Sequence, residues 1–242
     1  LTGATLTGVR SGGITATGTP PTLPTDWKLI NGYLVGPGAD LASATLTGAD
    51  LTSAILPDAV LTDAILTNAT LAYAQLRGVN LTDAVLTNAD LTGASLFEAT
   101  LSNANLTGAN LFTADLQHAN LLGATLIGAT LTDLPNANLT NANLSNADLT
   151  NADLTGATLT GATLTGVTSG GITATGTPPT LPTDWKLING YLIGPGADLS
   201  GATLPWPADL NHATLTGANL TDATLTGGVG LNHATLTGAN LT

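Results

Sequence analysis

The chain has 242 residues, a formal net charge of −12, no Cys and only four Lys or Arg residues. So few cations on an acidic chain argue against binding to nucleic-acid phosphates, and without Cys no disulfide or zinc–thiolate chemistry is available. No apolar run approaches the length of a membrane-spanning helix.

A five-residue unit, Ala-x-Leu-x-x, begins at the first residues and runs unbroken from Ala39 to Leu131. A helix would scatter these leucines around its circumference, and a straight strand would alternate them between two faces. A chain that bends about once every five residues keeps every Ala and Leu pointing inward. The unit often ends in Gly, Asn or Asp, as at Gly48, Asn68, Asp83 and Gly93. Such residues adopt positive φ at little cost, so we expect them at corners.

The segment Thr7–Gly38 departs from the unit, yet Leu6 and Leu41 stand a multiple of five apart. We therefore expect the coil to continue in phase here, with only the Pro-rich loop 17–27 leaving it, because Pro cannot donate to a strand ladder. Four residues then stand where the unit places its inward Ala: Val9, Ile14, Leu29 and Leu34. The alternative is a β-hairpin over Lys28–Val35 that turns at Asn31-Gly32.

Two further irregularities interrupt the repeat. Leu131 and Leu139 are eight residues apart, which predicts a three-residue bulge, Leu134–Asn136, at one corner. One-residue insertions follow at Trp206 and within the segment 227–230.

A larger repeat is superimposed on the short one. Residues 159–199 copy residues 1–41 with two differences, Arg10/Thr168 and Val35/Ile193. We predict one continuous solenoid over 1–242. Residues 1–158 form one large module with a loop excursion at 17–27, and residues 159–242 begin a second copy with its excursion at 175–185. Because the sequence has no Met, we interpret it as a processed product or part of a longer chain.

The unit Ala-(Asp/Asn/Thr)-Leu-x-x resembles the pentapeptide-repeat family over most of the chain. The resemblance implies an all-β fold, a right-handed quadrilateral β-helix with four units per coil. Its centre Leu and preceding Ala would fill the shaft, and the other three positions would face water or form corners.

Several residues suggest sites. His212 and His233 lie in identical twelve-residue segments and should stack on adjacent coils, either as exposed corner histidines or as two ligands of a metal site without a third. Trp27 and Trp185 close the Pro-rich loops and either anchor a partner or fold back. The leucines of the two ends, which are as regular as the middle, complete the candidate interface: Leu1, Leu6, Leu236 and Leu241.

Two surface patterns suggest ligands. Eight aspartates precede a centre Leu and should point outward: Asp40, Asp50, Asp90, Asp115, Asp148, Asp153, Asp198 and Asp209. They could mimic the DNA backbone, as the gyrase-protecting members of the family do, or form a solvated acidic surface. Thr47, Thr67, Thr87 and Thr107 are spaced by 20 residues and could form an ice-binding ladder, although strand propensity also explains them.

These patterns favour a non-catalytic structural rod or fibre segment. We expect no catalytic residues, cofactor or metal, because no nucleophile, base and carboxylate stand in a recognisable arrangement. The expected partners are copies of the chain joined head to tail, or further modules of a longer chain, with no nucleic acid and no membrane span. The modular duplication and the absence of Cys favour an extracellular or cell-surface location, and a cytoplasmic protein that protects a type II topoisomerase is the alternative.

Overall fold

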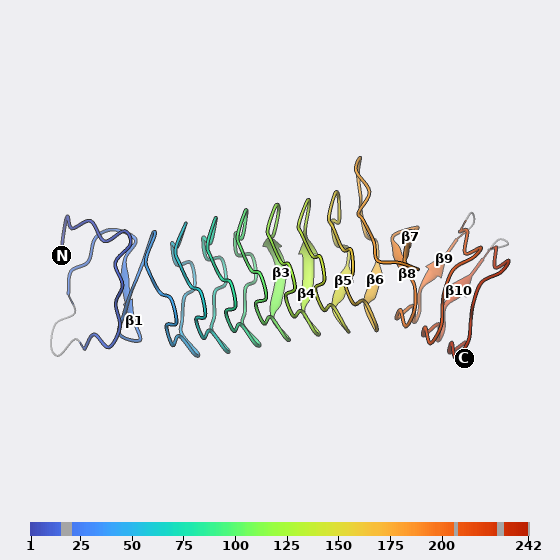
Figure 1. The fold of residues 1–242 in the computed structure, drawn as a ribbon, viewed down its shortest axis with the longest axis horizontal. Coiled ribbons are helices and arrows are strands. Elements are labelled where there is room, and N and C mark those ends of the chain that lie inside the picture. The colour runs from blue at the N-terminus through green and yellow to red at the C-terminus, as the bar shows by residue number, and fades with distance from the viewer. Residues whose placement is uncertain (16–20, 206–207, 227–229, 242) are drawn as a thin grey trace.

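The protein is a long stack of coils with its two ends at opposite ends of the stack, as Figure 1 shows for a computed structural model. The structure describes residues 1–15, 21–205, 208–226 and 230–241, and these contain strands, bridges and turns but no helix. The strands are β1 (Lys28–Ile30), β2 (Tyr33–Val35), β3 (Asn110–Asp115), β4 (Thr130–Asp133), β5 (Asp148–Thr150), β6 (Thr168–Gly170), β7 (Lys186–Ile188), β8 (Tyr191–Ile193), β9 (Thr203–Leu204) and β10 (Thr224–Leu225).

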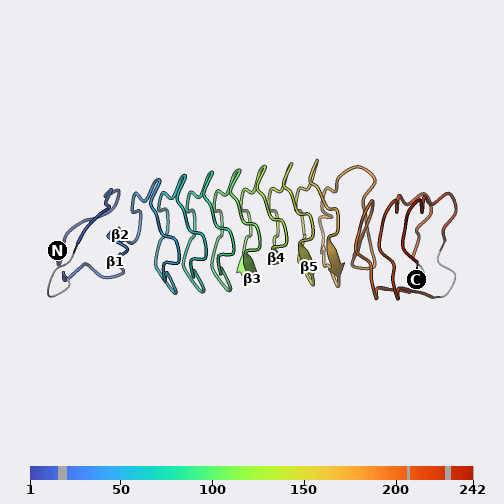
Figure 2. The same ribbon diagram turned by 90° about the horizontal axis from the view of Figure 1, so that it is seen from below.

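Four parallel ladders run along the stack, one on each side. They are exemplified by the bridges Asp40–Val60, Thr45–Ile65, Asp50–Thr70 and Ile55–Gln75. Each bridge joins residues 20 apart, and neighbouring ladders start five residues apart, so four units complete one coil. Figure 2 shows the same regular spacing from a second direction. The β3–β4–β5–β6 sheet forms where pairing is more extended: β3 and β4 pair in two neighbouring ladders, and β5 and β6 continue one of them. The predicted four-sided coil is therefore confirmed.

A tight turn forms each corner. The amide of Ala44 donates to the carbonyl of Leu41 at 3.0 Å, and Ser43 between them has a φ of 61°. A positive φ at the third residue is what a type II turn requires, which explains the Gly, Asn and Asp residues there. The predicted corners Gly48, Asn68 and Asp83 have φ values of 63°, 57° and 57°.

The Ala and Leu of each unit fill the shaft. Leu91, in the middle of the array, has 0% of its surface exposed, and its neighbours Ala89 and Ala94 have 1% and 0%. Burying a leucine side chain contributes roughly 1.5–3 kcal/mol. The amide of each centre Leu also donates to the next coil, as Leu91 does to Asn110 at 2.8 Å. Each coil is thus held by its neighbours rather than by a distant core.

The expected bulge at Leu134–Asn136 is wrong, because the coil is shortened there. Asp133 pairs with Asp115, an offset of 18 rather than 20. Leu134 is fully buried and donates its amide to Asp153, as a centre Leu does. One corner residue and the inward Ala are missing, so the chain runs straight through β4 from Leu131 to the next centre residue, Leu134.

The missing corner leaves a backbone group to be satisfied. On the preceding coil the amide of Thr113 donates to the hydroxyl Oγ1 of Thr132 at 2.9 Å. Regular corners use a backbone carbonyl for this bond, as Gly93 does with Phe112. A threonine side chain therefore replaces the carbonyl that the shortened corner withdraws.

The in-phase coil expected over 28–35 is also wrong, and the β-hairpin alternative is correct. Strands β1 and β2 pair antiparallel with Leu29 opposite Leu34, and Asn31 and Gly32 form the turn with φ values of 49° and 81°. β7 and β8 repeat the hairpin in the second copy. The flanking ladder joins Thr168 to Asp198, an offset of 30. The spacing stays a multiple of five because this coil holds ten extra residues, not because it stays in phase.

The second hairpin separates two apolar cores. Leu192 belongs to the core that begins at Val35, whereas the next residue, Ile193, belongs to a core that extends to Leu220. On β7, Leu187 packs against the first core and Ile188 against the second. The alternation of side chains along a strand places the hairpin between them.

Only part of the predicted excursion 175–185 leaves the ladder. Gly156 donates to the carbonyl of Thr177 at 2.8 Å, and Leu159 donates to that of Thr180 at 2.7 Å. Thr158 pairs with Thr180, so the Pro-rich loop adds only two residues to that ladder. Figure 1 shows this loop, between β6 and β7, rising above its neighbours. In the first copy, residues 16–20 lie outside the described residues.

The two one-residue insertions fall on Trp206 and residues 227–229, which also lie outside the described residues. The ladders around them agree with one extra residue per coil, because Asp198 pairs with Asn219 and Thr214 with Thr235, each 21 apart.

Candidate interaction surfaces

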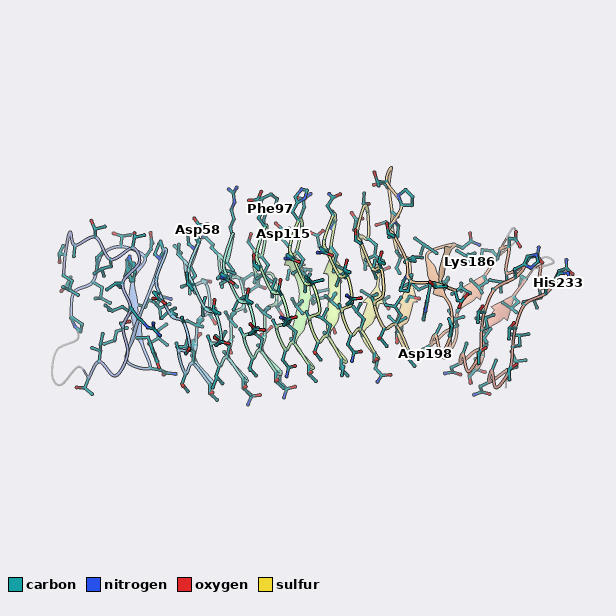
Figure 3. The ribbon with its side chains drawn as sticks, in the orientation of Figure 1. Asp58, Phe97, Asp115, Lys186, Asp198 and His233 are labelled. Carbon is teal, nitrogen blue, oxygen red and sulfur yellow. The ribbon has the colours of Figure 1, made fainter. Side chains whose placement is uncertain are left out.

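The two predicted histidines stack. The rings of His212 and His233 have centroids 5.1 Å apart and planes 12° apart, and both are exposed at corners with φ of 58°. Among the described residues no group of three or more His, Cys, Asp or Glu is placed to hold a metal ion. Figure 3 labels His233 near the C-terminal end of the stack.

The aspartates that precede a centre Leu face outward, and each can cap its own corner. Asp50 accepts a hydrogen bond from the amide of Thr52 at 3.0 Å. Hydrogen bonding from the hydroxyl and the amide of Thr52 lowers the pKa of Asp50. These carboxylates therefore stabilise the turns locally, as Asx motifs do.

Three carboxylates are stacked on one side of the solenoid. Asp133 pairs with Asp115 on one coil and with Asp153 on the next. Partial burial raises the pKa of Asp133, and the charges of Asp115 and Asp153 raise it further. The ladder neighbours of Asp50, Asp90, Asp148 and Asp198 are instead Thr or Asn.

The predicted threonine column lies at a corner. The amide of Asn68 donates to the carbonyl of Thr87, and that of Asn88 to the carbonyl of Thr107, so these threonines do stack one per coil. The hydroxyl of Thr107 is engaged with Asn105 Oδ1 at 2.7 Å. These threonines therefore lie in turns and not on the strand-like side of the coil where we expected them.

Trp27 and Trp185 fold back over their hairpins and are partly buried. A Cβ placed on Gly36 or Gly194 would collide with the respective indole ring. Only glycine therefore allows this approach. This packing corresponds to the fold-back alternative, and whether either ring also meets a partner remains a prediction.

The leucines at the two ends are only partly covered. Leu1 and Leu241 have exposed fractions of 59% and 63%, and Leu6 and Leu236 are half-buried. Leucines at equivalent positions within the stack are almost fully buried. The end coils thus present apolar side chains that a further coil would cover.

Sequence reasoning missed a cluster of unusual residues on one side. We call this side the Gln75 wall. It consists of the ladder that runs from Ile55 to Asp153 and of the two rows of corner residues that flank this ladder. It carries residue types that the rest of the array nearly lacks: Tyr73, Gln75, Arg77, Phe97, Glu98 and Phe112. The signal in the sequence is composition, since both Phe and the single Glu of the chain occur here.

Side chains on one edge of the Gln75 wall contact each other. The guanidinium carbon of Arg77 lies 5.2 Å from the ring centre of Phe97, and Arg77 pairs with Glu98 at 3.3 Å. Phe97 meets His118 edge to face at 5.7 Å. Figure 3 labels Asp58, Phe97 and Asp115 along one long edge of the stack, with Asp198 on the opposite edge.

These features define the class of protein: a right-handed quadrilateral β-helix whose shaft is filled by a five-residue repeat. The family model described as "Pentapeptide repeats (8 copies)" matches residues 44–83, 74–112, 94–133, 132–168 and 208–242, which is more than half of the chain. The chain belongs to the pentapeptide-repeat family, as its repeat unit indicated.

Several solved structures are similar. HetL, a pentapeptide-repeat protein involved in heterocyst differentiation regulation in the cyanobacterium Nostoc sp. strain PCC 7120, is 33% identical; the alignment covers 84% of this chain and 87% of HetL, with a TM-score of 0.33. A trypsin-treated form of QnrB1, a plasmid-mediated fluoroquinolone resistance protein, is 20% identical over 82% of this chain and 88% of its own, with a TM-score of 0.46. Rfr23 from the cyanobacterium Cyanothece 51142 is 40% identical over 40% of this chain and 63% of its own, with a TM-score of 0.21.

No curated protein sequence gave a significant match. Within the described residues, no helix is long and apolar enough to cross a membrane.

Proposed function

We propose that this protein is a non-catalytic structural rod whose large modules join end to end through an uninterrupted β-helix. The observation that carries the proposal is the junction between the first module and the second, at residues 158 and 159. Ladders cross it on each side through the bridges Asn143–Thr163, Asp148–Thr168, Asp153–Thr173 and Thr158–Thr180. The shaft is equally continuous, with Leu154, Leu159 and Leu164 almost fully buried.

The chemistry of a solenoid supports extension at such a junction. The backbone groups of a coil form hydrogen bonds with the coils on both sides. Because the first coil of one module pairs with the last coil of the module before it, further modules can be added in the same way. A further copy of the chain or a further module of a longer chain would supply the next coil. A contact between different ends does not close on itself, so it produces a filament rather than a ring.

The first test measures particle length for the 242-residue chain over a range of concentrations, by light scattering and electron microscopy. We expect particles of one width whose length increases with concentration. Leu236→Asp should shorten them, because a charge would be buried at the joint. Thr237→Asp adds the same charge on the outside of the same coil and should leave the length unchanged.

The second test adds one more copy of residues 1–158 in phase before Leu1. Small-angle scattering should show a single longer rod of the same width. Separate bodies joined by a flexible link, together with a 242-residue chain that stays monomeric at every concentration, would contradict the proposal.

The DNA-mimicking alternative remains a prediction. Its support in the described structure is one ladder of three carboxylates, Asp115, Asp133 and Asp153. Gyrase supercoiling measured with and without the protein distinguishes the alternatives, because protection or inhibition at low micromolar concentration would favour it over the rod.

A further inference from the structure

The Gln75 wall combines exposed rings with unpaired acids. Tyr73 and Phe112 lie on the same edge of the wall, two coils apart, with exposed fractions of 64% and 53%. Tyr73 lies over Gly93, where a Cβ would collide with its ring. In the described part of the chain neither ring contacts another ring or a cation. The exposed faces of the two rings therefore have no aromatic or cationic partner within the described chain.

The opposite edge of the wall shows which group such rings accept. Arg77 stacks on Phe97 and at the same time pairs with Glu98. A guanidinium satisfied by one aromatic face and one carboxylate is a favoured arrangement for arginine. On the edge with Tyr73 and Phe112 the rings are present, but the arginine is not.

The acids are present as well. Asp115 ends β3, the strand that also carries Phe112, and Asp115, Asp133 and Asp153 follow on consecutive coils. Among the described residues the single salt bridge is that of Arg77 with Glu98, so these carboxylates have no cationic partner. Partial burial raises the pKa of Asp133, and repulsion by the charges of Asp115 and Asp153 adds to the rise. A cation brought against this ladder would relieve the repulsion.

We propose that the Gln75 wall is a docking surface for an arginine-rich segment of another protein. Its Tyr73 and Phe112 rings would stack on guanidinium groups, and Asp115 and Asp133 would supply the opposite charge. The wall is roughly 13 Å wide between Tyr73 and Arg77, and the stretch from Tyr73 to Asp153 rises by about 19 Å, at one strand spacing per coil. A single extended or helical segment matches these dimensions.

The charge of the wall favours an arginine-rich segment over a second copy of the chain or a nucleic acid. A second copy would bring a net charge of −12 and only four cations, so like charges would meet at the wall. Nucleic acid is excluded by the same sign of charge. A basic segment is attracted, and arginine rather than lysine matches a surface that offers aromatic faces beside carboxylates.

The test uses two labelled twelve-residue peptides of alternating residues, one Arg-Ser and one Lys-Ser, with equal charge. Fluorescence anisotropy measures their affinities for the intact chain at one ionic strength. We expect the Arg peptide to bind several-fold more tightly. Tyr73→Ala and Phe112→Ala should each weaken it by roughly two- to fivefold, the size of an exposed cation–π contact. Phe112→Tyr keeps a ring and should preserve the affinity.

Matched controls lie on the diagonally opposite corner. Leu122 is an exposed apolar residue with a fraction of 40%, and Asp83 is an exposed acid on the same corner, two coils away. Leu122→Ala and Asp83→Asn should leave the affinity for the Arg peptide unchanged, whereas Asp115→Asn should weaken it. Equal affinities for the two peptides, or equal losses in the control and wall variants, would overturn the proposal.

Discussion

The two copies of the segment, 7–38 and 165–196, form the same hairpin contacts where both are described, but they are buried differently. In each copy a serine accepts a hydrogen bond from the hairpin, Ser11 from Leu34 at 2.8 Å and Ser169 from Leu192 at 3.0 Å. In each copy a tyrosine hydroxyl also accepts a hydrogen bond from a backbone amide of the next coil, as Tyr33 does from Thr45. Contacts inside the segment are therefore reproduced by its own sequence.

Burial differs because the two copies have different neighbours. Val167 is 0% exposed, whereas the equivalent Val9 is half-buried. Ile172 is 6% exposed and Ile14 is 37% exposed. The second copy is stacked on an intact array, through β5 and β6 among others. The comparison teaches that, in a solenoid, a residue gains its environment from the adjacent coil as much as from its own sequence.

The largest expected difference comes from a charge placed in each copy. Val167→Asp should destabilise the protein by roughly 3–5 kcal/mol, because an unpaired carboxylate would be buried in the shaft. Val9→Asp should cost about 1 kcal/mol or less, since water reaches that site. Urea denaturation followed by circular dichroism measures both, and equal losses would show that the first copy is as well covered as the second.

A substitution inside the segment should instead affect both copies equally. Gly36→Ala and Gly194→Ala each place a methyl group against an indole ring. We expect a loss of roughly 1–3 kcal/mol in both cases, the usual cost of overpacking. Tryptophan fluorescence should shift in each variant as the ring is displaced. A shift confined to one copy would indicate that the Trp–Gly contact differs between them.

The serine contacts should give a smaller and graded effect. Ser169 is buried and Ser11 is half-buried, and each satisfies an amide of its hairpin. Ser169→Ala should cost about 1–2 kcal/mol because the Leu192 amide is left unsatisfied away from water, and Ser11→Ala should cost less because water can replace the hydroxyl. Hydrogen exchange at Leu192 and Leu34 reports each bond, and faster exchange at Leu34 alone would reverse the expected order.

The smallest expected effect tests one of the two sequence differences between the copies. Thr168 is exposed and lies between Asp148 and Asp198 in its ladder. Thr168→Arg introduces the residue found at position 10 and should stabilise the protein by ~0.2–1 kcal/mol, because a cation would join two carboxylates. Thermal melts at low and high salt measure this, and a gain that persists in high salt would rule out the electrostatic cause.

The local pattern was predictable where one coil repeats another. Regular spacing identified the inward Leu and Ala, the corner Gly, Asn and Asp, and the stacked His212 and His233. The Gln75 wall was overlooked because its residues are outward ones, which the repeat does not constrain. Composition alone marks it, and only the fold brings Tyr73 and Phe112 to one edge.

The sequence by itself determined a chain that bends at each five-residue unit, because only then do all its Ala and Leu side chains point inward. The resemblance to the family implied four units per coil, and the ladder offset of 20 residues confirms it. Tertiary structure decided the rest. Counting by fives could not separate an in-phase coil from a coil with a hairpin and ten added residues, or a bulge from a shortened coil. These alternatives keep the same spacing and differ only in which groups meet across coils. The same holds for Val9 and Val167, which stand in nearly identical sequence segments, yet one is half-buried and the other fully enclosed.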